Sequence, residues 1–334
     1  MPRKKNDLNT IYISERLQEK LRPISRCTLT TVVAPMGYGK TTAVNWYLNE
    51  RVKKGGAVVI RISIYTNNLP IFWKSVQNAF RFAGFNFFEE YECPSDLASG
   101  GLFADDLSHL LAGETDYYIF IDDFHLLTDA RIGDFFCTLA KRIPDNIHII
   151  VASRDRFLSG GAVVGLGGNL HQITVDHLRL NHTELSIYSN LCGTELNDRQ
   201  IESLLHSSEG WFSAVYLNLC SFAERGELPD DHSDIYEMFS AAMIDPLPEK
   251  QREFLIVLGL ADEFSAEMAK FITENEDTKQ LLSAMTRQNA FISRLADGGD
   301  ISFSSYDERM CRAGFCSNGQ RKADCLSGML WRMV

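Results

Sequence analysis

The stretch APMGYGKTT, residues 34–42, constrains the fold of this chain more than any other part of its sequence. A β-rich apolar run at residues 29–33 precedes the stretch, and apolar residues at helical spacing follow it. A strand, a glycine-containing turn and a helix in this order are the setting of a phosphate-binding loop. An ordinary glycine turn between a strand and a helix is the alternative interpretation.

The residues of the turn carry the expected phosphate chemistry. Gly37 and Gly39 allow the backbone to curl so that successive N–H groups point inward, at the positive end of the following helix. Lys40 would reach the β- and γ-phosphates of a nucleotide, and the hydroxyl of Thr41 would bind Mg²⁺. Ala34 stands where the usual pattern has glycine, but a methyl group is a small intrusion there. The predicted nucleotide-contact residues of the stretch are Pro35, Met36, Gly37, Tyr38, Gly39, Lys40, Thr41 and Thr42.

A second signal is DYYIFIDDFHLL, residues 116–127. Its apolar centre followed by two acids predicts a buried strand of a parallel sheet that ends in carboxylates. Beside the phosphate loop, Asp122 would hold Mg²⁺, and Asp123 would orient or deprotonate an attacking water. A strand that ends in a solvated acidic turn is the alternative.

A third apolar strand, within NIHIIVASRDRF at residues 146–157, ends in polar residues. Because parallel strands deliver their carboxyl ends to one side of the sheet, Arg154 would emerge beside the phosphate loop and sense the γ-phosphate. A plain surface arginine is the alternative. Asp123, Lys40 and Arg154 are therefore the predicted catalytic residues.

The remaining pattern of the first half predicts an α/β doubly wound domain. Residues 57–65 indicate a further core strand, and residues 70–83 and 131–142 indicate helices that cover the sheet. The glycine-rich segment SGGAVVGLGGNL, residues 159–170, has no lysine at phosphate-loop spacing and does not plainly open a helix. We expect it to form a surface loop.

The motifs together resemble the STAND ATPases of the LuxR/MalT type, which are ATP-dependent bacterial transcriptional regulators. The resemblance runs in order through APMGYGKTT, YIFIDDFHLL, VASRDRF, LRLNHTEL and SSEGWFSAVYLNL, and covers about residues 10–300. It implies a P-loop NTPase sheet between helices, a helical lid and a winged helix. Alanine at the position of Ala34 is ordinary in this family.

The resemblance also implies a switch. Such proteins hold ADP in a resting state, exchange it for ATP when an inducer binds, self-associate, and reset by slow Mg²⁺-dependent hydrolysis. Gly210 and Trp211 correspond to the turn of the lid near the nucleotide, so they join the predicted nucleotide contacts. Packing is an equally good interpretation, because Trp211, Val215 and Leu219 share one face of an amphipathic helix.

The predicted domains are a nucleotide-binding domain at 1–178, a lid at 179–234 and a winged helix at 235–303. Helices are expected across 181–225, with Asn181 or Thr183 as a cap and Gly193 as a break, and 226–234 is expected to be a linker. The winged helix is predicted from three helices, at 249–259, 265–274 and 277–288, and from the segment AFISRLADGGDISF that follows them. This segment has the pattern of a strand, a turn and a second strand.

The last residues, 304–334, form an atypical tail with three cysteines and no clear period. The family would continue here into a histidine-containing stretch, a repeat sensor domain and a LuxR-type helix-turn-helix. We hypothesise that a shifted reading frame near residue 303 truncated the gene, with a short paralogue as the alternative. A truncated product with exposed apolar surface would be poorly soluble or degraded, and then without cellular function.

Composition restricts the remaining function classes. A net charge of −11 argues against a surface dedicated to nucleic acid, so we expect no direct DNA binding, even by the winged helix. No apolar stretch is long enough to cross a bilayer, which makes the cytoplasm the expected location. Nucleotide and a second copy of the chain are the expected partners, and a P-loop metabolic ATPase or small-molecule kinase is the alternative function.

Overall fold

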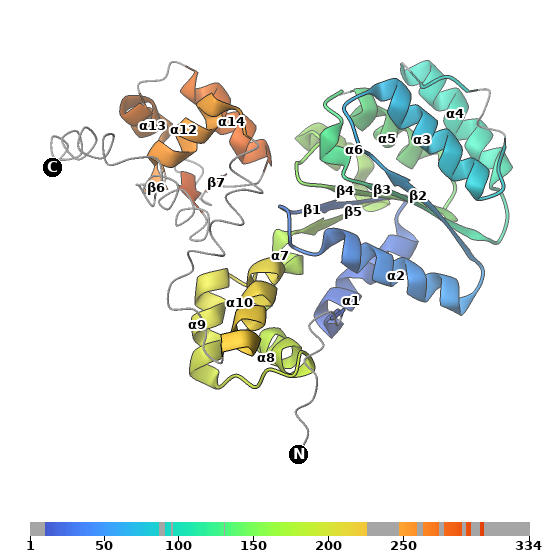
Figure 1. Cartoon of the computed structure of the whole chain (residues 1–334). Coiled ribbons are helices and arrows are strands. Elements are labelled where there is room, and N and C mark those ends of the chain that lie inside the picture. The colour runs from blue at the N-terminus through green and yellow to red at the C-terminus, as the bar shows by residue number, and fades with distance from the viewer. Residues whose placement is uncertain are drawn as a thin grey trace. The chain divides into compact units, whose positions relative to one another are not determined.

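The computed structural model divides the chain into two compact units, Ile11–Arg179 and a second unit that begins at Leu180. Figure 1 labels the helices and strands of both units. The described residues are 11–86, 91–94, 96–129, 131–225, 247–258, 263–273, 277–288, 292–294 and 301–303. The predicted linker at 226–234 and the tail at 304–334 lie outside them, so both stay predictions.

The first unit is built on a parallel sheet of five strands in the order β2-β3-β4-β1-β5. The strands are β1 (Leu29–Val33), β2 (Ala57–Ser63), β3 (Asp116–Asp122), β4 (Ile147–Ser153) and β5 (Leu170–Thr174). The first four occupy the segments in which the sequence predicts strands. All seven residues of β4 are buried, as expected of a central strand covered on both faces.

Helices cover both faces of the sheet, as predicted (Figure 1). Ile119 and Ile121 of β3 pack into one hydrophobic cluster, whereas Tyr118 and Phe120 pack into the other, because alternate side chains of a strand point to opposite faces. One face carries α3 (Leu69–Phe82), α4 (Leu97–Leu110), α5 (Arg131–Arg142) and α6 (Gly160–Leu166), and the other carries α1 (Glu15–Leu21) and α2 (Lys40–Lys54).

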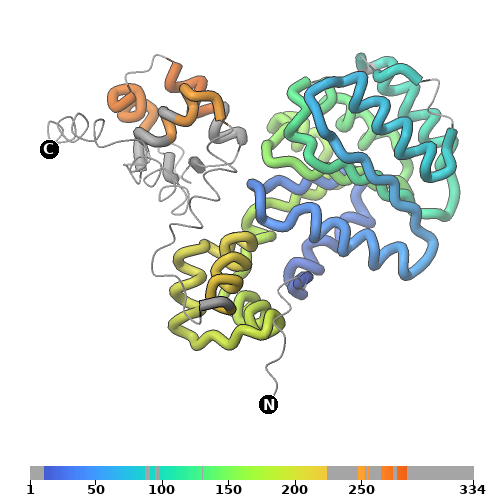
Figure 2. The backbone as a smooth tube through the Cα atoms, viewed as in Figure 1, coloured from blue at the N-terminus to red at the C-terminus, as the bar shows by residue number. Residues whose placement is uncertain are grey.

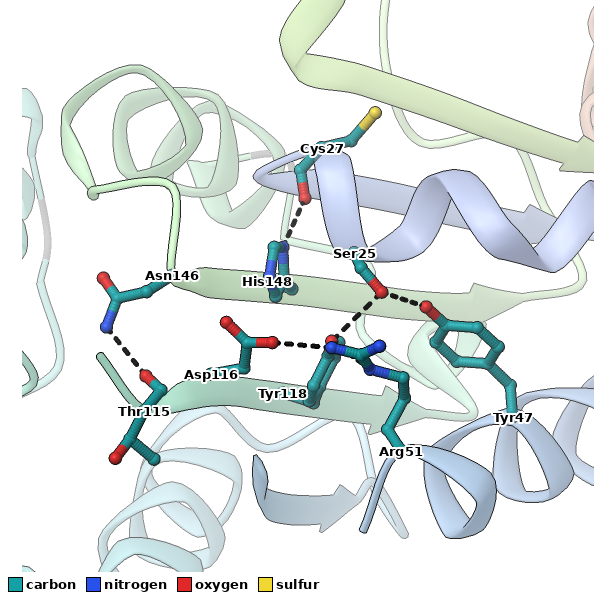
Figure 3. A network of polar contacts seen from close by, with 9 residues as sticks. All are labelled: Ser25, Cys27, Tyr47, Arg51, Thr115, Asp116, Tyr118, Asn146 and His148. Atoms are coloured by element: carbon teal, nitrogen blue, oxygen red, sulfur yellow. Dashed lines mark hydrogen bonds and ion pairs between the residues drawn. The ribbon is translucent and has the colours of Figure 1, made fainter. Parts of the chain in front are cut away.

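A polar network attaches α2 to the sheet at the end away from the phosphate loop (Figure 3). Arg51 of α2 pairs with Asp116 at the start of β3, Nη2 to Oδ2 at 2.7 Å, and its Nε donates to the hydroxyl of Tyr118 at 2.9 Å. The hydroxyl of Tyr118 in turn donates to Ser25 Oγ at 3.1 Å, and Ser25 also bonds the hydroxyl of Tyr47. These bonds fix the helix whose first turn would hold a phosphate.

The glycine-rich segment 159–170 is not a surface loop, so that prediction is wrong. Ser159 caps α6, because its hydroxyl accepts from the backbone N–H of Ala162 at 3.2 Å, and Leu166 is buried in the core. A short 3-10 turn, Gly167–Asn169, then leads into β5. A local cap and one buried leucine outweigh the poor helix propensity of three glycines.

From Leu180 on, the described residues of the second unit begin with the helices α8 (His182–Leu191), α9 (Asp198–Ser208) and α10 (Phe212–Arg225). These helices form the yellow group in Figure 2. They confirm the helices predicted across 181–225. Asn181 is the cap, because its side chain accepts from the N–H of Glu184 while Glu184 bonds back to the N–H of Asn181. Gly193 has a φ of 76° and follows the end of α8, as expected of a break.

The C-terminal part of the second unit contains α12 (Glu249–Leu258), α13 (Ala266–Thr273) and α14 (Thr278–Gln288), close to the predicted helices. The strands β7 (Ile292–Arg294) and β8 (Ile301–Phe303) pair antiparallel, which confirms the predicted hairpin. A third strand, β6 (Glu263–Phe264), pairs with β8 and was not predicted, because two residues are too few for a periodic pattern.

Candidate nucleotide site

The turn between β1 and α2 has the backbone of a phosphate-binding loop. Gly37 and Gly39 have φ values of 80° and 78°, in the left-handed region that costs other residues about 1–2 kcal/mol. Gly39 directly precedes α2, and no atom lies within 4 Å of the place where its Cβ would stand. The open space at this helix N-terminus leaves room for a phosphate against the backbone N–H groups.

Lys40, the first residue of α2, is buried and bonded to the loop itself. Its Nζ donates to the carbonyl oxygens of Ala34 at 2.7 Å and Pro35 at 2.8 Å. Burial, with the nearby charge of Arg154 second, lowers the pKa of Lys40 to about 8. The ammonium is bonded to neutral acceptors and not to a carboxylate, so an anionic phosphate would be a stronger partner.

Ala34 is fully buried and its methyl group packs in the cluster on the α2 side of the sheet. Its N–H donates to the carbonyl of Ser153 at 3.3 Å, which continues the pairing of β1 with β4. Alanine at this position therefore extends the strand and the core, and does not obstruct the loop.

Thr41 and Asp122, the two predicted Mg²⁺ ligands, lie together. The hydroxyl of Thr41, in the first turn of α2, lies near the carboxylate of Asp122 at the end of β3. Burial raises the pKa of Asp122, while the neighbouring hydroxyl of Thr41 acts in the opposite direction. A hydroxyl and a carboxylate at one point beside a phosphate loop are the oxygen ligands that Mg²⁺ uses when phosphates complete its shell.

Arg154 is brought to the same edge by the strand order, because β4 lies between β1 and β3. Val33 of β1 is level with Ser153 of β4, so Arg154 emerges beside the loop. One nitrogen of its guanidinium, Nη2, contacts the sulfur of Met36 at 3.6 Å. The structure therefore brings Lys40 and Arg154 together at the loop, with their predicted catalytic roles still to be tested.

Asp123 has a left-handed backbone, with φ 57° and ψ 36°, and its N–H donates to Oδ1 of Asp122 at 3.0 Å. Its own carboxylate is about half exposed and 3.9 Å from Nδ1 of His125. His125 lies within the acidic motif, and the sequence alone predicts no role for it. Its place three residues after Asp122, in a turn at the sheet edge, is the signal that would have found it.

These residues fit a nucleoside triphosphate with Mg²⁺. An open helix N-terminus, a buried lysine bonded to neutral acceptors, and a paired hydroxyl and carboxylate are the donor and acceptor types that such a ligand needs. Among the remaining predicted contacts, Tyr38 is half-buried in the loop and Thr42 is exposed on the first turn of α2. Gly210 and Trp211 belong to the other unit, so their contact with nucleotide stays a prediction.

The packing role of Gly210 and Trp211 is well defined within their own unit. Trp211 is buried, as are Val215 and Leu219 on the same face of α10. Gly210 has a φ of 72°, and its carbonyl accepts from the N–H of Leu180 at 2.9 Å. A Cβ on Gly210 would overlap the carbonyl oxygen of Leu180. The glycine is required by this backbone approach, whatever its relation to nucleotide.

Parts of the chain match known proteins in sequence. Residues 240–304 match the family model of the MalT winged helix domain. The HTH-type transcriptional regulators MalT of Vibrio campbellii and Yersinia enterocolitica are both 22% identical, over 85% and 88% of this chain. This chain is therefore similar to MalT regulators over most of its length. It spans about a third of the length of these relatives, 33% and 34%.

A solved structure has a similar fold. The Walker-type ATPase PABY2304 of Pyrococcus abyssi matches with a TM-score of 0.62 over 93% of this chain and 99% of its own chain, at 12% identity. At that identity the likeness concerns the fold alone. Within the described residues, no helix is long and apolar enough to cross a membrane.

Proposed function

We propose that this MalT relative is a regulatory switch that binds ADP and ATP with Mg²⁺ in the loop after β1. The observation that carries the proposal is the convergence of Lys40, the Thr41–Asp122 pair and Arg154 at the ends of three neighbouring strands. The similarity to MalT regulators supports a regulatory switch over a metabolic enzyme. In a regulator, the bound nucleotide sets the conformation of the protein and is not consumed to make a metabolite.

The side chains divide the work by their chemistry. Lys40 would leave the carbonyls of Ala34 and Pro35 and bond the β- and γ-phosphates, where its charge is better compensated. Thr41 and Asp122 would hold Mg²⁺, which neutralises phosphate charge when bound. Arg154 would contact the γ-phosphate, and the carboxylate of Asp123 would orient the attacking water.

In this proposal the ADP-bound chain is the resting state, and the ATP-bound chain self-associates. Slow hydrolysis of ATP would return the chain to the resting state. We propose no DNA contact for the described residues, since the acidic chain offers little to attract phosphate backbones. The cytoplasmic location stays a prediction from the sequence.

The test begins with the purified chain. Acid denaturation and chromatography of the released small molecules would find ADP in near-stoichiometric amount. After exchange into ATP and Mg²⁺, a single-turnover assay would follow slow phosphate release, and sedimentation would follow association. A chain that releases no nucleotide and takes up neither ADP nor ATP would contradict the proposal. Rapid turnover with one added metabolite would support the small-molecule kinase instead.

A further inference from the structure

His125 lies in the 3-10 turn Phe124–Leu126, which directly follows Asp123, and Nδ1 of its ring is 3.9 Å from the carboxylate of Asp123. The side chain is 12% exposed, and its Nδ1 is buried. Within the described part of the chain, that nitrogen makes no hydrogen bond. A buried ring nitrogen without a hydrogen-bond partner destabilises the fold, so we expect this nitrogen to gain a partner in another state of the site.

The surroundings of His125 fix its charge. Burial first, and then the positive charge of Arg154, lower the pKa of His125 to about 4. Asp123 acts in the opposite direction and Lys40 in the same direction as Arg154. The imidazole is therefore neutral at physiological pH, with one nitrogen that donates and one that accepts.

The carboxylate of Asp123 is a charged group close to the ring of His125. Its Oδ1 is 3.9 Å from Nδ1 of His125, which is too long for a hydrogen bond. The Asp123 side chain is 54% exposed and has room to turn, whereas the imidazole is held by burial. A shift of about 1 Å by the carboxylate would bring it within bonding distance.

We propose that His125 is a positioning residue, whose Nδ1–H donates to the carboxylate of Asp123 and holds it against the attacking water once ATP is bound. The inference rests on the proposed function, because it assumes that Asp123 acts on that water. A neutral donor suits this role. It orients the carboxylate and leaves it anionic, so that the carboxylate still accepts a hydrogen bond from water.

Two substitutions separate this role from simple packing. In His125→Asn the amide nitrogen can replace Nδ1 as a donor, whereas in His125→Gln it reaches toward the place of Nε2. We expect the rate constant of ATP hydrolysis to fall about tenfold to hundredfold in His125→Gln and to stay within about threefold of the wild type in His125→Asn. The affinity for ADP and the KM for ATP are expected to be unchanged in both.

A second readout does not depend on activity. In the full chain with ¹⁵N-labelled histidine, the ring nitrogen shifts of His125 report which nitrogen carries the proton. With a slowly hydrolysed ATP analogue we expect the Nδ1–H form, and in Asp123→Asn we expect the shift of Nδ1 on analogue binding to be reduced. An Nε2–H form with the analogue bound would overturn the inference.

The kinetic outcomes also distinguish the two proposals. Normal ADP binding with equal hydrolysis by the wild type, His125→Asn and His125→Gln refutes the role of His125 and leaves the switch intact. Loss of ADP binding in both variants, with thermal unfolding unchanged, also refutes it, because His125 would then be a binding residue. Failure of the wild-type chain to bind ADP refutes the proposed function itself.

Discussion

Replacing Gly210 by alanine separates the two interpretations of the turn before α10. The glycine has a φ of 72°, which costs alanine about 1–2 kcal/mol. The added Cβ would overlap the carbonyl oxygen of Leu180 and lie 3.0 Å from its nitrogen and 3.1 Å from its carbonyl carbon. Because these are backbone atoms, the chain segment around Leu180 must move. The hydrogen bond from the N–H of Leu180 to the carbonyl of Gly210 then weakens.

Overpacking of this kind adds about 1–3 kcal/mol, so the total loss is about 2–5 kcal/mol. Hydrogen exchange read by mass spectrometry on peptides from α8, α9 and α10 measures this loss in the nucleotide-free chain. A loss of about 4 kcal/mol corresponds to roughly thousandfold faster exchange, up to the rate of the open state. Gly84→Ala is the matched control, since Gly84 has a φ of 93° but open space around the missing Cβ.

Equal exchange in Gly210→Ala and Gly84→Ala would refute the packing argument. If Gly210 mattered only through nucleotide, exchange in the nucleotide-free chain would be unchanged and only the affinity for ADP would fall. The predicted nucleotide contact of Gly210 would then be the correct interpretation.

The other predictions concern the loop and the helix that follows it. The pKa of Lys40 is about 8 without nucleotide, and bound phosphate would raise this pKa, so ADP binding should take up a proton near pH 8. The affinity for ADP measured by calorimetry should therefore be full below pH 8 and fall above it. In Lys40→Arg the affinity should not fall in this range, because the guanidinium stays charged. Thr41→Val should remove about tenfold of the Mg²⁺-dependent gain in ADP affinity, and Thr42→Val should keep it. Arg51→Ala should lower the thermal midpoint by about 3–6 °C, while Lys53→Ala, an exposed pair with Glu50, should leave it unchanged.

The strand, loop and helix around residues 29–54 could be predicted because every signal there is local. Two glycines permit the left-handed backbone of the loop, and the apolar residues on either side have a strand-like and then a helical period. Lys40 and Thr41 add side chains that suit phosphate and Mg²⁺, which an ordinary turn does not need. The acidic end of β3 could also be predicted from the sequence, because four apolar residues, which are buried in the structure, precede Asp122.

Other features depend on contacts that no local pattern carries. The strand order places Arg154 between the loop and Asp122, and this follows from long-range pairing alone. The edge strand β5 is short and half polar, so its LHQIT sequence has no strand-like period. The glycine content of residues 159–170 favours a loop, whereas the cap at Ser159 stabilises the helix α6. The place of His125 after Asp122 is visible in the sequence, but its buried and unsatisfied nitrogen exists only in the folded chain.

The central claim is that the loop after β1 binds nucleotide through Lys40. Titration of ADP with Mg²⁺ into the nucleotide-stripped chain and into Lys40→Ala tests it most directly, with Lys54→Ala, on the exposed end of the same helix, as control. We predict saturable binding that weakens about tenfold to hundredfold in Lys40→Ala, as expected for one charged bond to phosphate, and is unchanged in Lys54→Ala. Equal affinity of the wild type and Lys40→Ala would contradict the account.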